Sequence, residues 1–411
     1  MSTVQEYKKE ITEIFRQNTR RGFADWRQCG NLCYEIVRLL SSAATALSRS
    51  GRYDDLFEIT NRAFIKWGKT NKDDSNGETM SFMDEVENAW ECVYRKGGFI
   101  VSHKKMLKWF TDHMDGSVID YLEDYMMRFI VDHFKEDDLQ QEKLRFLNER
   151  IDRLTEQLEE HPVYSFDIRH CQENILQIYG EVDFPIEDVR IYAAKIQGPR
   201  AKEILADIEK NKGNEDEYIR IYQDLSQQYD GGWNRDYKYG IRLKDHYRET
   251  GNSQLYKEQL KFLVYHAIGK KDLLSEYKNL FTSEEWPAER SKLFSGIKTA
   301  DYRALEWFAM EEDYERLMTG VEYGGSYYLK QYEGELAARF PERCRQIIIK
   351  TAETQAVGSS NRNEYRKLAQ TLRWLKRYPG GSETASELAN QYCERYPRRW
   401  AMIEELRKVC S

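Results

Sequence analysis

The chain has 411 residues, 32% of them charged and 40% hydrophobic, and its formal net charge is −7. This balance argues against a disordered chain and against a protein drawn to nucleic acid over its whole surface. A chain of this length usually divides into two or more domains, although a repeat array can grow in one dimension without dividing.

The N-terminus and the cysteines bear on the location of the protein. The first ten residues lack the apolar core of a signal peptide, and no run approaches the 18 apolar residues of a membrane span. We therefore expect a cytoplasmic protein without a membrane partner. Its seven scattered cysteines predict reduced, mostly buried thiols rather than a disulfide framework; they are Cys29, Cys33, Cys92, Cys171, Cys344, Cys393 and Cys410.

Residues 1–68 are predicted to form N-terminal helical hairpins. Apolar residues recur three and four apart over 4–20 and over 26–48, which is the spacing of an amphipathic helix. The turn at Ser50–Arg52 then leads into a third helix that buries Leu56 and Trp67. Residues 69–81 are polar and rich in turn formers, so they predict a surface loop.

Residues 82–208 are predicted to form a middle helical region, with helices over 82–96, 102–113, 118–133 and 139–160 and shorter ones after residue 165. Residues 70–140 carry 16 acidic and 8 basic side chains. This is either a solvated acidic face or a surface that meets a basic partner. The leucines of 139–160 alternate three and four apart, which predicts packing inside a helical array or a seam for another chain.

Residues 209–411 contain the clearest repeated pattern. Gly213, Gly251 and Gly269 each begin a turn, and an apolar residue five positions later opens the next helical stripe. Glycine suits the left-handed position that closes a helix, so we expect positive φ at all three. Stripes and turns of this kind run from end to end of the chain. The sequence therefore predicts an all-α fold without a sheet, an elongated array of antiparallel helical hairpins.

A resemblance supports this architecture. Three stretches resemble the C-terminal helical region of bacterial SWIM-type zinc-finger proteins: Gly269–Leu274, Ala337–Arg343, and Arg362 to Leu406, which includes Tyr378–Gly381 and Tyr396–Trp400. The resemblance covers residues 229–409 and implies a tetratricopeptide-like α-solenoid that serves as a binding scaffold. The family's C-x-C and C-x-H zinc motif does not occur in this chain, so what that module binds cannot be transferred.

No motif in the sequence indicates an enzyme, a metal site or a cofactor. Cys29 and Cys33 lie one helical turn apart, but no other ligand stands at motif spacing, so buried structural thiols are the favoured interpretation. Asp112–His113 and Asp132–His133 could suggest a general base, yet neighbours in a helix point in different directions. We interpret both histidines as helix ends.

Two sets of residues are candidates for binding a partner. The first lies in glycine-rich connections, where aromatic side chains can contact a ligand or pack on the next hairpin: Trp233, Tyr323 and Tyr327. The second is the C-terminal surface, where residues 362–411 carry 11 basic and 6 acidic side chains and arginines stand beside aromatic rings: Arg373, Arg377, Tyr378, Arg395, Arg398, Arg399 and Trp400. That surface is a solvated end cap, or it binds a partner.

The sequence favours a non-catalytic scaffold that binds a protein or peptide through a helical-repeat surface. The alternative is a nucleic-acid-associated accessory factor that uses the basic C-terminal hairpins. An acidic face of a second copy, residues 70–140, is a further possible partner of the basic surface, which makes self-association an open alternative.

Overall fold

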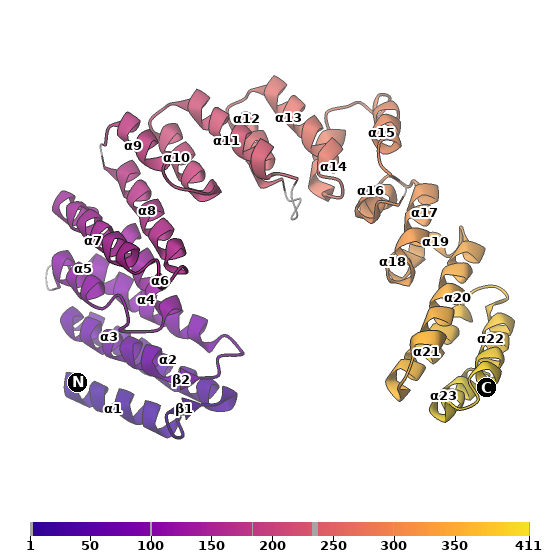
Figure 1. Cartoon of the computed structure of the whole chain (residues 1–411), viewed down its shortest axis with the longest axis horizontal. Helices are drawn as coiled ribbons and strands as arrows, with labels where there is room; N and C mark the ends of the chain where they lie inside the picture. Colours follow the sequence, from indigo (N-terminus) through magenta and orange to yellow (C-terminus); the bar gives the residue numbers. More distant parts are fainter. Residues whose placement is uncertain (1–2, 99–100, 183, 232–236, 299, 411) are drawn as a thin grey trace. The chain divides into compact units, whose positions relative to one another are not determined.

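The computed structural model describes residues 3–98, 101–182, 184–231, 237–298 and 300–410. Over these ranges the protein is almost wholly helical, as the sequence predicts, with the helices following one another along the chain (Figure 1). The chain divides into two compact units, Met1–Tyr218 (unit 1) and Ile219–Ser411 (unit 2). The boundary predicted after residue 208 falls inside unit 1, ten residues before this division (218 − 208). No described helix is both long enough and apolar enough to cross a membrane.

Unit 1 holds the first ten helices and the two short strands. Their bounds are α1 (Val4–Gln17), β1 (Phe23–Ala24), α2 (Trp26–Arg49), α3 (Tyr53–Lys69), β2 (Asn71–Lys72), α4 (Glu78–Lys96), α5 (His103–Asp112), α6 (Asp120–Asp132), α7 (Asp137–Glu156), α8 (Tyr164–Glu181), α9 (Ile186–Ala193) and α10 (Pro199–Asn211). The helix α11 (Glu215–Tyr229) contains the division between the units.

Unit 2 holds the remaining helices, most of them shorter. Their bounds are α12 (Lys238–Glu249), α13 (Ser253–His266), α14 (Lys271–Lys278), α15 (Trp286–Ser295), the 3-10 turn η1 (Tyr302–Ala304), α16 (Leu305–Met310), α17 (Tyr314–Gly324), α18 (Ser326–Gln331), α19 (Glu333–Leu336), α20 (Pro341–Gly358), α21 (Arg362–Leu375), α22 (Gly381–Arg395) and α23 (Trp400–Cys410).

Local sequence accounts for where several helices begin. Asp25 caps α2, because its carboxylate accepts the main-chain N–H groups of Arg27 and Gln28 while the Gln28 side chain bonds back to Asp25. Pro199 stands at the first position of α10, where its missing N–H costs nothing. Residues at the helix start therefore account for where α2 and α10 begin.

The glycine turns adopt the predicted conformation. Gly213, Gly251 and Gly269 have φ values of 82°, 73° and 96°, and Gly51 before α3 has 65°. These lie in the left-handed region, which a side chain at Cβ disfavours. At Gly269 a Cβ atom would also approach the Arg303 carbonyl oxygen at 2.5 Å, so this glycine is required twice over.

The core of unit 1 is rich in large aromatic rings. Trp67 stacks on Phe82, with ring centroids 4.4 Å apart, and Trp90 meets Phe64 and Phe110 edge to face. Such pairs add stability beyond the area they bury. The predicted seam of α7 also packs inside the unit, since α7 lies along α8 and its Leu147 is fully buried.

Two details differ from the sequence prediction. The fold is not free of strands: Phe23–Ala24 pairs in parallel with Asn71–Lys72, which ties the start of α2 to the segment after α3. The predicted loop 69–81 is shorter than expected, because α3 continues to Lys69 and α4 already begins at Glu78. The polar character of Glu78, Thr79 and Ser81 misleads the prediction, because Thr79 is buried and accepts a hydrogen bond from the Trp67 indole, while Glu78 is half-buried.

The cysteines behave as predicted among the described residues. All seven thiols are free; Cys29, Cys33, Cys171 and Cys344 are buried, Cys92 and Cys393 are half-buried, and Cys410 is exposed. Burial of these thiols is consistent with a hydrophobic role for most of them.

Candidate functional site: an open groove along α2

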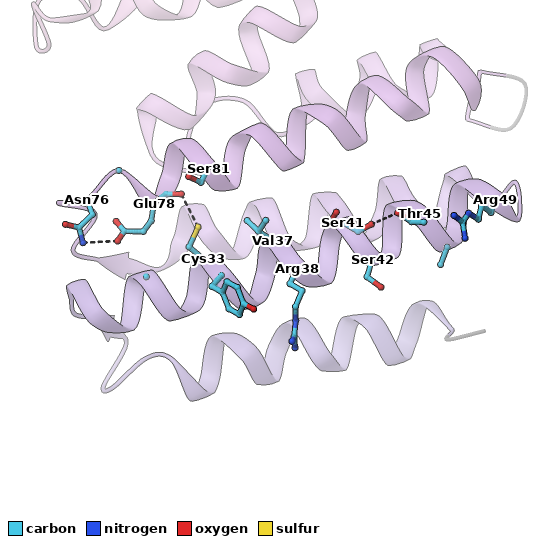
Figure 2. A pocket seen from close by; sticks show the side chains of 14 residues that line it. Cys33, Val37, Arg38, Ser41, Ser42, Thr45, Arg49, Asn76, Glu78 and Ser81 are labelled. Carbon is cyan, nitrogen blue, oxygen red and sulfur yellow. Dashed lines mark hydrogen bonds between the residues drawn. The ribbon is translucent and has the colours of Figure 1, made fainter.

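An open concavity in unit 1 runs along the exposed face of α2 (Figure 2). We call it the α2 groove; it has a volume of about 860 Å³ and is lined by Gly30, Cys33, Tyr34, Val37, Arg38, Ser41, Ser42, Thr45, Ala46, Arg49, Asn76, Gly77, Glu78 and Ser81. All but the last four belong to α2. The last four form the turn into α4 and the beginning of that helix. The groove thus follows one helix for most of its length.

The two-sided sequence of α2 creates this face. Residues such as Leu32, Ile36 and Leu40 are fully buried in the core of unit 1. The residues between them at helical spacing point outward and are exposed, including Tyr34 at 68%. A helix can present a polar groove only where no neighbouring helix covers its second face.

The wall opposite α2 is fixed by hydrogen bonds around Glu78. The Cys33 thiol donates to the Glu78 carbonyl at 3.3 Å, and the Asn76 amide donates to the Glu78 carboxylate at 3.1 Å, as drawn in Figure 2. Gly77 precedes Glu78 in the left-handed conformation, with φ 78°. These contacts hold the first turn of α4 against α2.

The electrostatics of the groove are set by two arginines. Arg38 lies over the Tyr34 ring, with its guanidinium carbon 5.9 Å from the ring centroid. Within the described residues neither Arg38 nor Arg49 forms an ion pair. Both are exposed, so the groove offers two guanidinium groups to an external anion.

Burial governs the titratable groups beside the groove. Burial raises the pKa of the Cys33 thiol to about 11, and the carboxylates of Glu78 and Asp74 raise it further. Burial also raises the pKa of the Glu85 carboxyl, which a hydrogen bond with Ser41 opposes. A thiol with a raised pKa is protonated at neutral pH and is a poor nucleophile. The groove is therefore equipped for binding rather than for thiol chemistry.

One set of groups beside the groove has the composition of a metal site. The Cys29 thiol and the carboxylates of Asp74 and Glu78 each place a ligand atom within 4.8 Å of the other two. The sequence predicts no metal site, because Cys29 and the two acids are more than forty positions apart along the chain. The fold brings them together through the pairing of β1 with β2.

The C-terminal candidates lie on different elements. Arg373 and Arg377 lie at the end of α21, whereas Arg395, Arg398 and Arg399 lie between α22 and α23 near the end of α20. The candidates therefore come from two places in the fold of unit 2.

Two of these candidates hold unit 2 together. Arg399 donates to the carbonyl oxygens of Ala356 at 2.8 Å and Val357 at 3.5 Å, in the last turn of α20. Tyr378 is 5% exposed and donates its hydroxyl to Glu333 at 2.9 Å. The structure gives no support to a direct contact of the Tyr378 ring with a partner.

The other candidates are accessible where they are described. Arg373, Arg377, Arg395 and Arg398 are exposed, and so is Trp400, at 73%. The aromatic candidates of the connection between α17 and α18 are exposed as well, Tyr323 at 70% and Tyr327 at 74%. Trp233 lies outside the described residues.

The histidines next to acids take the predicted place at helix ends. His113 and His133 are the C-terminal caps of α5 and α6, and each ring contacts the carbonyl oxygen four residues before it. The second nitrogen of His133 lies 2.6 Å from the Glu91 carboxylate, not beside Asp132. These contacts join helices and do not assemble a base with a nucleophile.

Sequence reasoning missed the α2 groove, although a signal was present. Polar and aromatic residues recur at helical spacing on the face opposite the apolar stripe: Tyr34, Arg38, Ser41, Ser42, Thr45 and Arg49. Such a polar face is normally solvated, so nothing local distinguishes a groove from an ordinary surface. A search of protein families and a search of curated proteins both end without a match.

Proposed function

We propose that the protein is a non-catalytic adaptor that binds an acidic segment of a protein partner along the α2 groove. The observation that carries the proposal is the pair Arg38 and Arg49, which face one open groove without an acidic partner among the described residues. An unpaired guanidinium on an exposed helix binds carboxylates readily, since its fork matches them in geometry.

The dimensions of the groove favour a polypeptide over a small metabolite. The lining runs from Gly30 to Arg49, which corresponds to about 28 Å of helix. Small-molecule sites enclose their ligand, whereas this groove is long and open. A partner helix of comparable length would place carboxylates three turns apart opposite Arg38 and Arg49, and its apolar residues beside Val37 and Ala46.

Within each unit the helix packing supports assignment as an α-solenoid of helical hairpins. Successive helices pack on each other, as α7 does on α8 and α12 on α13, and α2 packs on α4 while α21 packs on α23. Contacts with the next helix and the next but one are typical of stacked hairpins. We propose on this basis that each unit is a tetratricopeptide-like stack with a binding face.

Selection from a phage library of random 20-residue peptides on the full chain tests the adaptor proposal. We expect recovered peptides rich in Asp and Glu with apolar residues at helical spacing. Replacing both groove arginines (Arg38→Glu with Arg49→Glu) should weaken their binding at least about tenfold, or about 1.4 kcal/mol. Reversing the charge of exposed Lys9 and Arg62, outside the groove, makes the same charge change and should leave binding intact. Equal binding by both double variants would refute the assignment of the groove.

A second candidate function is association with nucleic acid through the C-terminal hairpins. It rests on the exposed arginines Arg395 and Arg398 beside the exposed ring of Trp400. Phosphate contacts give binding that falls steeply with salt, whereas a groove that also buries apolar residues gives a shallow dependence. Retention of the chain on single-stranded nucleic acid between low and moderate salt therefore separates the two candidates.

A further inference from the structure

Three ligand-bearing side chains converge where α2 meets the segment before α4. They are the Cys29 thiol on the first turn of α2, the Asp74 carboxylate after β2, and the Glu78 carboxylate at the start of α4. Each ligand atom lies within 4.8 Å of the other two. Some point is then within about 2.8 Å of all three atoms (4.8/√3), so shifts of less than an ångström bring them to metal–ligand distances of about 2.0–2.3 Å.

The cluster is incompletely satisfied by the protein's own hydrogen bonds. Cys29 is fully buried, and its sulfur has no hydrogen-bond partner among the described residues. The Glu78 Oε2 atom is buried and accepts no hydrogen bond, although its Oε1 accepts from Asn76. Buried acceptors without a donor are rare in folded proteins, because desolvation then has no compensation.

The ammonium group of Lys72 does not neutralise this cluster. Lys72 lies near Cys29 and Asp74, but its ammonium donates to the carbonyl oxygens of Trp67 at 2.9 Å and Thr70 at 3.3 Å. It also lies over the Trp67 ring, 4.9 Å from the centroid. A cation from solvent would offset the charge of the Asp74 and Glu78 carboxylates beside the Cys29 sulfur.

We propose that Cys29, Asp74 and Glu78 bind a divalent metal ion of the zinc class. One soft sulfur and two carboxylate oxygens are a donor set that suits Zn²⁺ and its spectroscopic substitute Co²⁺ better than Mg²⁺ or Ca²⁺, which prefer oxygen alone. The metal–sulfur bond forms as the thiol proton leaves to solvent. The ion fastens the segment between β2 and α4 to α2, and through Glu78 it fixes one end of the α2 groove.

Titration of the metal-free full chain with Co²⁺ tests the site. We expect one ion per chain and a thiolate-to-cobalt charge-transfer absorption, which Zn²⁺ then displaces. Cys29→Ser should abolish that absorption, and Asp74→Asn and Glu78→Gln should each weaken Co²⁺ binding at least about tenfold. Cys92→Ser and Asp73→Asn are matched controls, from the same unit and outside the cluster, and should bind as the unaltered chain does.

Far-ultraviolet circular dichroism of each variant separates loss of the site from loss of the fold. If Cys29→Ser does not fold, the two carboxamide variants decide, since both change partly exposed residues. Co²⁺ binding without a thiolate absorption, or equal binding by Asp74→Asn, Glu78→Gln and the controls, would overturn the proposal. The measurement of Co²⁺ binding involves no partner protein, so its result tests the metal site independently of the adaptor function.

Discussion

The arginines of α2 and those of the C-terminal helices look alike in sequence and are used differently in the structure. Arg38 and Arg49 face an open groove and pair with no acid among the described residues, whereas Arg399 is bound to two main-chain carbonyls at the end of α20. Lys143 in unit 1 resembles Arg399, because it donates to the Val131 and His133 carbonyls at the end of α6. A cation that caps a helix is part of the fold, and one that faces a groove is available to a partner.

The largest expected effect concerns the buried cap in unit 1. Burial lowers the pKa of Lys143 to about 8, well below its value in an unfolded chain, and Lys143 is fully buried. Between about pH 8 and 10.4 the Lys143 amine therefore binds more protons in the unfolded chain, and this group alone should raise the free energy of unfolding with pH by roughly 3 kcal/mol. Buried thiols such as Cys29 and Cys33, whose pKa is raised, contribute in the opposite direction in both chains, so the measured quantity is the difference between the unaltered chain and Lys143→Met in urea unfolding across this range. An unchanged slope in the variant would show that Lys143 is not the responsible group.

The half-buried cap in unit 2, Arg399, should respond to charge reversal. Arg399→Glu removes two hydrogen bonds to α20 and places a negative charge at a helix C-terminus, so we expect a loss of about 2–3 kcal/mol. Arg398→Glu changes a neighbouring exposed residue and should stay within about 0.5 kcal/mol. Chemical denaturation of both variants makes the comparison. Equal stability of the two would mean that Arg399 is as free as the groove arginines.

A smaller effect is expected for the buried tyrosine of the C-terminal set. The Tyr378 hydroxyl donates to Glu333, which the Trp374 indole also contacts at 2.6 Å. Tyr378→Phe removes one hydrogen bond and leaves the packing, so unfolding should become easier by about 1 kcal/mol. Partner binding along the α2 groove should not change, and a binding defect at full stability would return Tyr378 to the list of contact residues.

The smallest effect on stability is expected in the groove itself. Arg38→Glu alters an exposed side chain whose only described contact is the Tyr34 ring, so the melting temperature should barely move. Binding of an acidic peptide should nevertheless weaken. This combination distinguishes a binding arginine from a capping one, and a marked loss of stability would place Arg38 with the caps.

The fold was largely predictable and the site was not, for one physical reason. The buried face and the ends of a helix are determined by residues a few positions apart, so the apolar stripe of α2 and the turns at Gly213, Gly251 and Gly269 were predicted correctly from sequence. Whether Arg399 is free depends on carbonyl oxygens some forty positions away. The same holds for Cys29, whose carboxylate neighbours come from beyond α3. Contacts between distant segments leave no local pattern.

The pairing of β1 with β2 bears on the order in which unit 1 forms. It joins Phe23 to Asn71, so it closes a loop of 48 positions (71 − 23), at an entropic cost of at least about 3 kcal/mol. Two residues per strand make too few hydrogen bonds to offset that cost alone. Pairing must therefore follow the docking of α2 on α3, so we expect residues 70–77 to order late in refolding and to open before the helices on either side. Limited proteolysis should cut there before it reaches the helices on either side.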